Sequence, residues 1–348
     1  YYKTDSRNQI LKLATTAASG YTSQVRNAGH IRNRGYEIQL GAVPIQTSKG
    51  FRWNLDLNYG ANSSKVVKLD DEGLITSYQL YSSGIQILAS VGEAYGTLFG
   101  TSYVRDANGN VVVDANGLPK ISTTNKTLGK FTPDWTGGIS NTFSYRSLSL
   151  SFLIDASVGG SIFSNTNKTG KYTGVLANTL SGRDAEHGGL WYYTDAMGNN
   201  VRLSESPSYS VSSDGLYYAQ VNGQSTRVYQ DGIMVEGVTE SGSKNEEVVS
   251  AEKYYHRIYS IAEANVYDAS YVKLREVALS YRLPRLWTQK LHLQEASVTL
   301  TGRNLWTIYK SVPNIDPESA LTTGNAQGVE AYSLPTTRSF GVNLSVKF

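Results

Sequence analysis

The last ten residues of the chain, SFGVNLSVKF, alternate between a small or polar side chain and an apolar one without exception. The apolar positions are Phe340, Val342, Leu344, Val346 and Phe348. Successive side chains of a β-strand point to opposite faces, so this period of two predicts a strand with one apolar and one polar face. If protein covers the apolar face, the strand belongs to a soluble fold such as a sandwich, and if lipid covers it, the strand belongs to a membrane barrel. The other strands help to decide between these two folds.

Alternation of the same kind recurs in stretches such as FRWNLDLNYGA and LSLSFLIDASV. These runs are about twice the 5–6 residues usual for a strand of a soluble protein, and they match the length that a tilted strand needs to cross a bilayer. No Asp, Lys or Arg interrupts their apolar faces. We predict eight strands, over residues 1–13, 30–46, 50–61, 134–146, 147–159, 268–283, 294–308 and 336–348.

The alternation changes register within residues 268–283. Val272 and Leu274 share one face, whereas Val277 and Leu279 occupy positions that an uninterrupted strand would turn to the other face. A switch of this kind predicts a β-bulge, because one extra residue restores the apolar side chains to the same face.

The connections between the predicted strands fall into two classes. Three are short, at 47–49, between 146 and 147, and at 284–293. In an up-and-down meander all three lie at one end, which is typical of outer-membrane barrels with short periplasmic turns. We therefore predict an all-β fold, a transmembrane antiparallel up-and-down β-barrel of the bacterial outer membrane. Its C-terminus would lie on the periplasmic side, and its long extracellular loops would include 62–133 and 160–267.

The composition agrees with this prediction and excludes several classes of site. Tyrosine occurs 25 times, glycine occurs 33 times and 18% of residues are charged, and tyrosine is typical of positions between apolar and aqueous surroundings. The net charge of +3 gives no basis for binding nucleic acid, which needs clustered basic residues. The chain has no cysteine, so it contains no disulfide, thiolate metal site or cysteine nucleophile.

Clustered aromatic residues in the region 160–267 are candidates for contact with a ligand or a partner. They are Trp191, Tyr192, Tyr193, Tyr217 and Tyr218. Flat, amphipathic rings stack on sugars and pack against peptides or proteins. The interpretation that we favour is that these rings pack the long loop against itself.

The near-repeat DANGNVVVDANG presents Asp106, Asn108 and Asn110 at alternate positions, as a calcium loop would. An EF-hand loop also needs glycine at its sixth position and glutamate at its twelfth, where this chain has Val111 and Gly117. Asn-Gly pairs are typical of tight hairpin turns, so a β-hairpin is the favoured interpretation.

No catalytic or metal-binding arrangement is recognised. The stretch SGRDAEHGG brings Ser181, Asp184 and His187 close in sequence, but it has neither a nucleophile elbow nor an oxyanion loop. The histidines lack metal-ligand spacing and are scattered, at His30, His187, His256 and His292. We therefore predict that the protein is not an enzyme and binds no cofactor.

Several longer stretches carry a resemblance to a known family. YDASYVKLREVALSYRLP, SVTLTGRNLWTIYKSVPNIDPES and RSFGVNLSVKF resemble the C-terminal barrel of SusC/RagA-type TonB-dependent outer-membrane transporters. NAGHIRNRGYEIQLGAVPI, FRWNLDLNYGANSSKVVKL and FTPDWTGGISNTFSYRSLSLSFLIDASVGGSIFSNTN are similar to the same family. The resemblance implies that residues 1–348 form the C-terminal part of a plugged barrel, for which about 22 strands are typical.

The resemblance further implies active import of oligosaccharides, glycans or peptides, with a SusD-like surface lipoprotein as partner and energy supplied by TonB. The start YYKTDSRNQI lacks the features of a signal peptide, and no plug or TonB-contacting segment is recognised. We expect these parts and the N-terminal strands to lie outside this chain. The alternative function is a passive porin or an outer-membrane adhesin or receptor.

Polar residues on the predicted inner faces are candidates for lining the path of a ligand. They are Arg52, Asn54, Asp56, Asn58 and Asn343. The general polarity of a barrel wall, or contact with a plug, would explain the same residues. The apolar residues of the C-terminal strand would face outer-membrane lipid while that strand seals the barrel during assembly.

Overall fold

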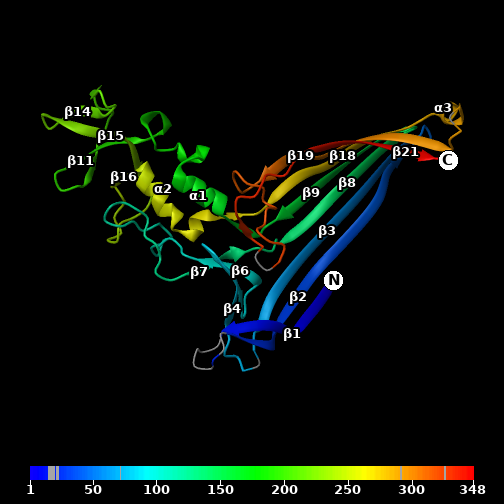
Figure 1. Cartoon of the computed structure of the whole chain (residues 1–348), viewed down its shortest axis with the longest axis horizontal. Helices are drawn as coiled ribbons and strands as arrows, with labels where there is room; N and C mark the ends of the chain where they lie inside the picture. The colour runs from blue at the N-terminus through cyan, green and yellow to red at the C-terminus, as the bar shows by residue number, and fades with distance from the viewer. Residues whose placement is uncertain (15–19, 21–22, 71, 291, 325–326) are drawn as a thin grey trace.

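The chain forms one long curved sheet that carries a smaller unit of strands and short helices at one end (Figure 1). The computed structural model describes residues 1–14, 20, 23–70, 72–290, 292–324 and 327–348. The described residues build an antiparallel sheet of eight strands. In spatial order they are β1 (Tyr2–Ala14), β2 (Ser23–Gln46), β3 (Phe51–Lys68), β8 (Trp135–Tyr145), β9 (Leu148–Val158), β18 (Tyr271–Arg282), β19 (Glu295–Lys310) and β21 (Ser339–Lys347).

All eight predicted strands are confirmed, and so is their antiparallel up-and-down order. Two strands are longer than predicted: β2 begins at Ser23 rather than 30, and β3 ends at Lys68 rather than 61. The sequences of the additional segments, SQVRNAG and NSSKVVK, contain few apolar residues. Alternation of apolar and polar residues identifies a strand only where one of its faces is apolar. It therefore gives no signal where these strands continue past their last apolar residues.

The register aligns apolar side chains across the sheet. Leu40 lies opposite Leu57, Leu57 opposite Ile139, and Ile139 opposite Ile154. These residues belong to a continuous apolar face, which we call the apolar band. Many of its side chains are exposed, including Leu40 at 58% and Leu57 at 36%. An exposed apolar surface of this extent is typical of a membrane interface.

One polar residue lies within the apolar band. Asn141 follows Ile139 on the same face, and its side-chain oxygen accepts a hydrogen bond of 3.0 Å from Trp53 Nε1. Asn141 is only 6% exposed. A polar group removed from water costs little once its hydrogen bond is made, so the band accommodates this amide.

The predicted bulge in β18 is confirmed. The register of β18 against both neighbours shifts between Leu274 and Glu276. Against β9, Arg275 is the extra residue, and it has no partner in either ladder. The apolar residues before and after the bulge therefore stay on one face of the sheet.

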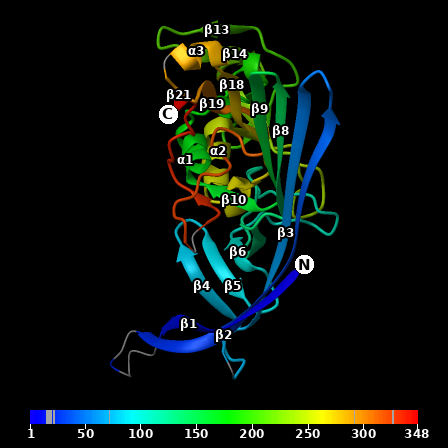
Figure 2. The ribbon, with the colours of Figure 1, turned by 90° about the vertical axis from the view of Figure 1, so that its right-hand side faces the viewer.

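The short and long connections lie at opposite ends of the sheet (Figure 1). The short end has the turns at 47–50 and 146–147 and the helix α3 (Arg285–Lys290), and the C-terminus lies near α3. In Figures 1 and 2 the helices α1 (Asn165–Thr173) and α2 (Ala251–Tyr259) lie together on one side of the sheet. The long connections that follow β3, β9 and β19 thus gather into one unit rather than extending separately.

This unit, which we call the loop unit, contains most of the buried apolar core. One cluster joins four side chains that are fully buried: Ile87, Leu98, Phe163 and Val329. The strands of the unit are β4 (Ser77–Ser82), β5 (Gln86–Ser90), β6 (Tyr95–Gly100), β7 (Lys126–Lys130), β10 (Ser161–Ser164), β11 (Leu190–Thr194), β12 (Asn200–Arg202), β13 (Tyr209–Val211), β14 (Tyr217–Val221), β15 (Gln224–Met234), β16 (Val248–Ser250), β17 (Val266–Asp268) and β20 (Val329–Glu330).

The predicted hairpin in the DANGN stretch is confirmed. Asp106 N–H donates to the Asn110 carbonyl at 3.0 Å, and the Asp106 carboxylate accepts the N–H groups of Asn108 and Asn110. Arg105 and Val111 pair across the turn. The acidic side chain therefore organises the turn itself.

The two edges of the sheet are β1 and β21, and within the described residues they are not paired with each other. The sheet is therefore an open segment of wall. Its edge N–H and C=O groups need partners from further strands if the sheet is to lie in a bilayer. Among the described helices, none has the length and apolar character required to span a membrane.

Candidate functional site

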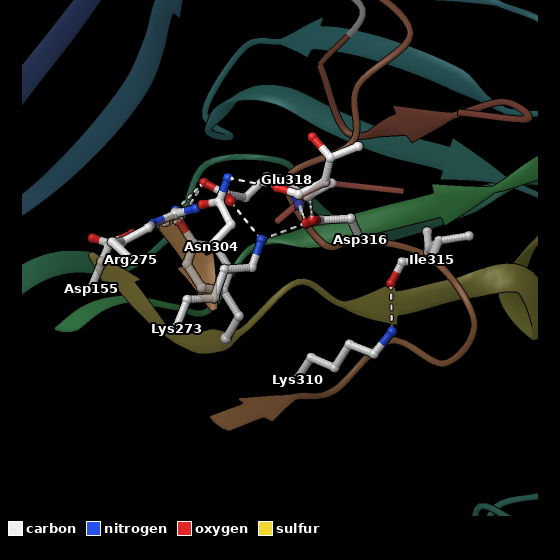
Figure 3. A network of polar contacts seen from close by, with 11 residues as sticks. Asp155, Lys273, Arg275, Asn304, Lys310, Ile315, Asp316 and Glu318 are labelled. Atoms are coloured by element: carbon white, nitrogen blue, oxygen red, sulfur yellow. Dashed lines mark hydrogen bonds and ion pairs between the residues drawn. The ribbon is translucent and has the colours of Figure 1, made fainter. Parts of the chain in front are cut away.

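Residues 311–324 and 327–338 form a segment that we call the strap, and its Asp316 and Glu318 contact the inner face of the sheet, opposite the apolar band. Lys273 on β18 connects the wall to the strap (Figure 3). Its Nζ lies 2.6 Å from Asp316 Oδ1 and 2.6 Å from Glu318 Oε2. The side chain of Lys273 is 6% exposed and that of Asp316 11%. These charges are therefore largely removed from water and depend on each other for compensation.

Arg275, the bulged residue, extends this network along the wall. Its Nε and Nη2 donate to Asp155 Oδ2 on β9 at 2.9 and 2.6 Å, and Nη2 also pairs with Glu318 (Figure 3). Tyr271 donates its hydroxyl to Glu318 at 2.9 Å. The bulge leaves Arg275 free of the regular ladder, so its guanidinium can join a strand residue to the strap.

The carboxyl group of Glu318 is held in its charged form by this network. Burial raises the pKa of Glu318, but the hydrogen bonds from Arg275 and Lys273 outweigh burial and lower the pKa to about 2. A carboxylate whose folded pKa is depressed stabilises the folded state above its unfolded pKa. That contribution is lost as the pH falls through the folded pKa, so the attachment of the strap is retained at neutral pH.

The strap also contacts the rest of the loop unit, to which its own strand β20 belongs. The fully buried Glu330 accepts hydrogen bonds from Ser164 Oγ at 2.7 Å and from Thr166 Oγ1 at 2.6 Å. Asn314 Nδ2 donates to Asn167 Oδ1 of α1 at 2.8 Å, and β20 pairs in parallel with β10. The strap therefore joins α1 and β10 to the wall strand β18.

Two neighbouring cavities lie in the loop unit, with volumes of about 680 and 400 Å³. Lys171 of α1 and Tyr255 of α2 line both of them. The larger cavity also contacts Tyr103, Tyr254 and Ile258, so aromatic and aliphatic side chains form much of its wall. The volume is in the range typical of ligand pockets.

Lys171 is the buried cation of these cavities. Its Nζ donates to the Ala264 carbonyl at 2.8 Å and to Asn265 Oδ1 at 3.3 Å, and it lies 5.3 Å from the centre of the Tyr267 ring. These contacts leave one N–H without a hydrogen-bond acceptor among the described residues. Burial lowers the pKa of Lys171 to about 8, because a low-dielectric site disfavours the charged amine.

Further polar groups surround the smaller cavity. Arg183, Asp231 and His256 contribute to its lining. Burial raises the pKa of Asp231, although the hydrogen bond from the Tyr192 hydroxyl acts in the opposite direction. In the described parts of the chain, no group of three or more His, Cys, Asp or Glu is placed to hold a metal ion. The lining of the smaller cavity therefore offers charge and hydrogen bonds to a ligand.

The predicted aromatic candidates lie in the sheet of the loop unit and mainly contact one another. Trp191 packs against Tyr217 at 5.8 Å between ring centres and belongs to a buried cluster. Tyr192 stacks on Tyr229 at 5.0 Å. Trp191 and Tyr192 are buried, whereas Tyr193 and Tyr218 are half-buried. This arrangement agrees with the favoured packing interpretation, and a contact with a ligand or partner stays a prediction.

The predicted lumen residues occupy β3 and β21. Arg52 Nε donates to Asn54 Oδ1 at 2.8 Å on the face opposite the apolar band. Asp56 and Asn58 continue that face of β3, and Asn343 lies opposite Thr299 in the ladder between β21 and β19. Their role in lining a path stays a prediction. The apolar residues of β21 and the terminal Phe348 are exposed, from Val346 at 37% to Phe348 at 83%.

The residues SGRDAEHGG build a local turn. Asp184 Oδ1 accepts the backbone N–H of His187 at 2.9 Å and lies 2.7 Å from its ring Nδ1. The backbone carbonyl of Ser181 accepts the Tyr255 hydroxyl at 3.0 Å. These contacts stabilise the turn 185–187, and the absence of enzymatic activity stays a prediction.

Two functional features were not found from the sequence. The strap contacts depend on residues about 40 positions apart in the chain, such as Lys273 and Asp316. Lys171 lies in a polar stretch, NTNKTGKYT, that gives no sign of burial. The acidic residues of NIDPES were an available signal, because they occur together in a connection that follows a strand rich in inner-face polar residues.

Comparison with known proteins supplies the family context. No family model matches the chain. The TonB-dependent receptor P3 of Formosa agariphila is 26% identical over 377 residues, which cover 100% of this chain and 32% of that protein. The predicted resemblance to TonB-dependent receptors is confirmed. The TonB-dependent receptor P26 of the same organism is 24% identical over 376 residues, again with 100% of this chain and 32% of that protein covered.

Solved structures show the same relationship at the level of the fold. The RagAB peptide transporter matches with a TM-score of 0.59 and 19% identity over 99% of this chain and 32% of the matched chain. The RagAB peptide importer in its closed-closed state matches with a TM-score of 0.58 and 18% identity over 99% of this chain and 33% of the matched chain. The predicted fold class is confirmed, and the chain spans about a third of the TonB-dependent receptors that it matches.

Proposed function

We propose that this chain forms the C-terminal part of the barrel of a TonB-dependent importer in the bacterial outer membrane, with its C-terminus in the periplasm. The observation that carries the proposal is the coincidence of two findings. The whole chain matches TonB-dependent receptors, and its sheet presents an exposed apolar band with all long connections gathered at one end. In this arrangement the loop unit faces the medium, and the inner face lines the path of the imported molecule.

A SusD-like surface lipoprotein is the proposed partner, and the loop unit is the surface that would meet it. TonB would act through parts of the importer outside this chain. The cargo that the cavities favour is a peptide rather than a neutral glycan, because Lys171 offers a buried positive charge and a free N–H to a carboxylate. The solved RagAB structures are described as a peptide transporter and importer, which supports the same choice.

Uptake by living cells tests the proposal. Cells that carry the complete importer are expected to accumulate labelled oligopeptides only when TonB is functional. Deletion of the importer, with TonB intact, is expected to abolish that accumulation. Uptake that persists without TonB, together with steady conductance of the purified protein in planar bilayers, would instead identify a passive porin.

The pKa of Lys171 predicts how binding depends on pH. The amine is charged below its folded pKa of about 8 and becomes neutral above it, so its attraction for a carboxylate is lost as the pH rises. Binding of an acidic peptide is expected to weaken about tenfold from pH 7 to pH 9, in proportion to the charged fraction. Calorimetry or fluorescence titration measures this. An analogue with amidated carboxyl groups is the control, and an equal loss of affinity for both peptides would contradict the assignment.

A further inference from the structure

Basic residues gather on the outer face of β1, β2 and β3, just beyond the apolar band. In the ladder, Arg34 lies opposite Lys3 on β1, and Arg32 lies opposite Lys65 on β3. Arg7 lies on the same face of β1 as Lys3, and Asp5 lies between them. We call these five basic residues the basic rim.

The register shows that the basic rim belongs to the face of the apolar band. Arg32 and Arg34 alternate in step with Tyr36, Ile38 and Leu40 along β2, and no register shift against either neighbour interrupts this segment. Residues two apart in a strand lie on the same face. The rim is therefore on the outside of the wall, where the strands continue past the apolar side chains.

A row of aromatic residues separates the apolar band from the basic rim. Tyr1 contacts Tyr36 with ring centres 5.1 Å apart, and Tyr59 contacts Trp135 at 5.7 Å. Aromatic residues of this kind mark the boundary between hydrocarbon and headgroups in outer-membrane barrels. Along β3, the eight-residue rise from Phe51 to Tyr59 corresponds to a height of about 20 Å at a tilt of about 40°, close to the usual height of about 25 Å for a lipid-facing band.

The charges of the basic rim are mostly unpaired. Asp5 is the only acidic residue among the outer-face positions of these rows, and it accepts hydrogen bonds from both His30 and Arg32. In the described structure, no hydrogen bond or ion pair engages the side chains of Lys3, Arg7, Arg34 and Lys65, and all four are exposed. The surface therefore has a net positive charge at the level of the headgroups.

We propose that the basic rim binds the phosphate of an anionic lipid in the outer leaflet, whose acyl chains lie along the apolar band. The position argues for a lipid rather than a soluble anion, because the unpaired cations adjoin the aromatic row on the lipid-facing side. Arginine and lysine both bind phosphate, arginine through paired N–H groups. Cations at the headgroup level attract anionic lipids. The inference rests on the proposed outer-membrane location.

Native mass spectrometry of the complete importer, titrated in detergent with monophosphoryl lipid A, tests this inference. The variant R34Q/K65Q is expected to bind the lipid about thirtyfold more weakly than the wild type, because two headgroup-level charges are lost. The matched control is K49Q/R146Q, which removes two exposed basic residues at the short-turn end of the sheet. The control is expected to bind as the wild type does.

Three results would overturn the inference. The first is equal lipid binding by R34Q/K65Q and the wild type, and the second is an equal loss in the control. The third is displacement of the lipid by excess inorganic phosphate, which would identify a site for free phosphate instead. Peptide uptake by R34Q/K65Q is measured in parallel and is expected to be retained. Lipid binding without any TonB-dependent uptake would count against the proposed function and leave the lipid site standing.

Discussion

Replacing Lys273 by methionine is expected to destabilise the protein by about 3–5 kcal/mol and to release the strap from β18. The change leaves Asp316, which is 11% exposed, without the cation that compensates its charge. Glu318 also loses one of its two cationic partners. Removing one partner of a buried ionic network is more damaging than removing an exposed pair, because the remaining charge keeps its desolvation penalty.

The matched control for this prediction is Arg282→Gln, on the same strand. Arg282 pairs with Glu295 at 2.9 Å, but their side chains are 68% and 50% exposed. Such a surface pair contributes at most about 1 kcal/mol. The melting temperature and limited proteolysis within 311–338 are the measurements. If K273M has the same melting temperature as R282Q and is cleaved at the same rate within the strap, this network does not hold the strap.

Replacing Leu57 by arginine is expected to destabilise the folded protein in a bilayer by about 2–4 kcal/mol. Leu57 lies near the middle of the apolar band, opposite Leu40 and Ile139. A charged side chain at this depth must be taken out of water without a partner, or must distort the bilayer to reach it. Urea unfolding from lipid vesicles measures the change.

Asn58→Arg is the control for this substitution, because Asn58 is adjacent in sequence and lies on the opposite face of β3. An arginine there is expected to change stability by less than about 1 kcal/mol, since the inner face is polar and reached by water. Equal destabilisation by the two variants would contradict the assignment of the faces.

Most of the eight wall strands could be predicted from the sequence because each carries its own signal, whereas β1 alternates poorly, with Lys3, Asp5 and Arg7 on its outer face. A strand between lipid and a polar interior must alternate, so residues such as Val342 and Leu344 report their environment locally. The bulge at Arg275 was also readable, since it shifts that alternation by one residue. The ends of β2 and β3 were missed because the sequence there, such as NSSKVVK at the end of β3, does not alternate apolar with polar residues.

The loop unit and the strap could not be predicted in the same way. Their structure depends on contacts between distant segments, such as Glu330 with Ser164 and Lys273 with Asp316. Alternation carries no information about such pairs. The burial of Lys171 has the same origin, because α2 and residues 262–267 cover it only after the chain has folded. Trp191 shows the converse: together with its neighbour Tyr193 and with Tyr217, all singled out from the sequence, it forms a local core.

The central claim is that hydrocarbon covers the apolar band, and the accessibility of spin labels tests it most directly. This chain has no cysteine of its own, so a single cysteine can be placed at Leu55, Leu57, Asn58 or Phe152 in turn. In a bilayer, labels at the three apolar positions are predicted to collide with dissolved oxygen and not with a water-soluble nickel complex, whereas the label at Asn58 should show the reverse. Labels at the apolar positions that reach neither reagent would show protein, not lipid, against that face.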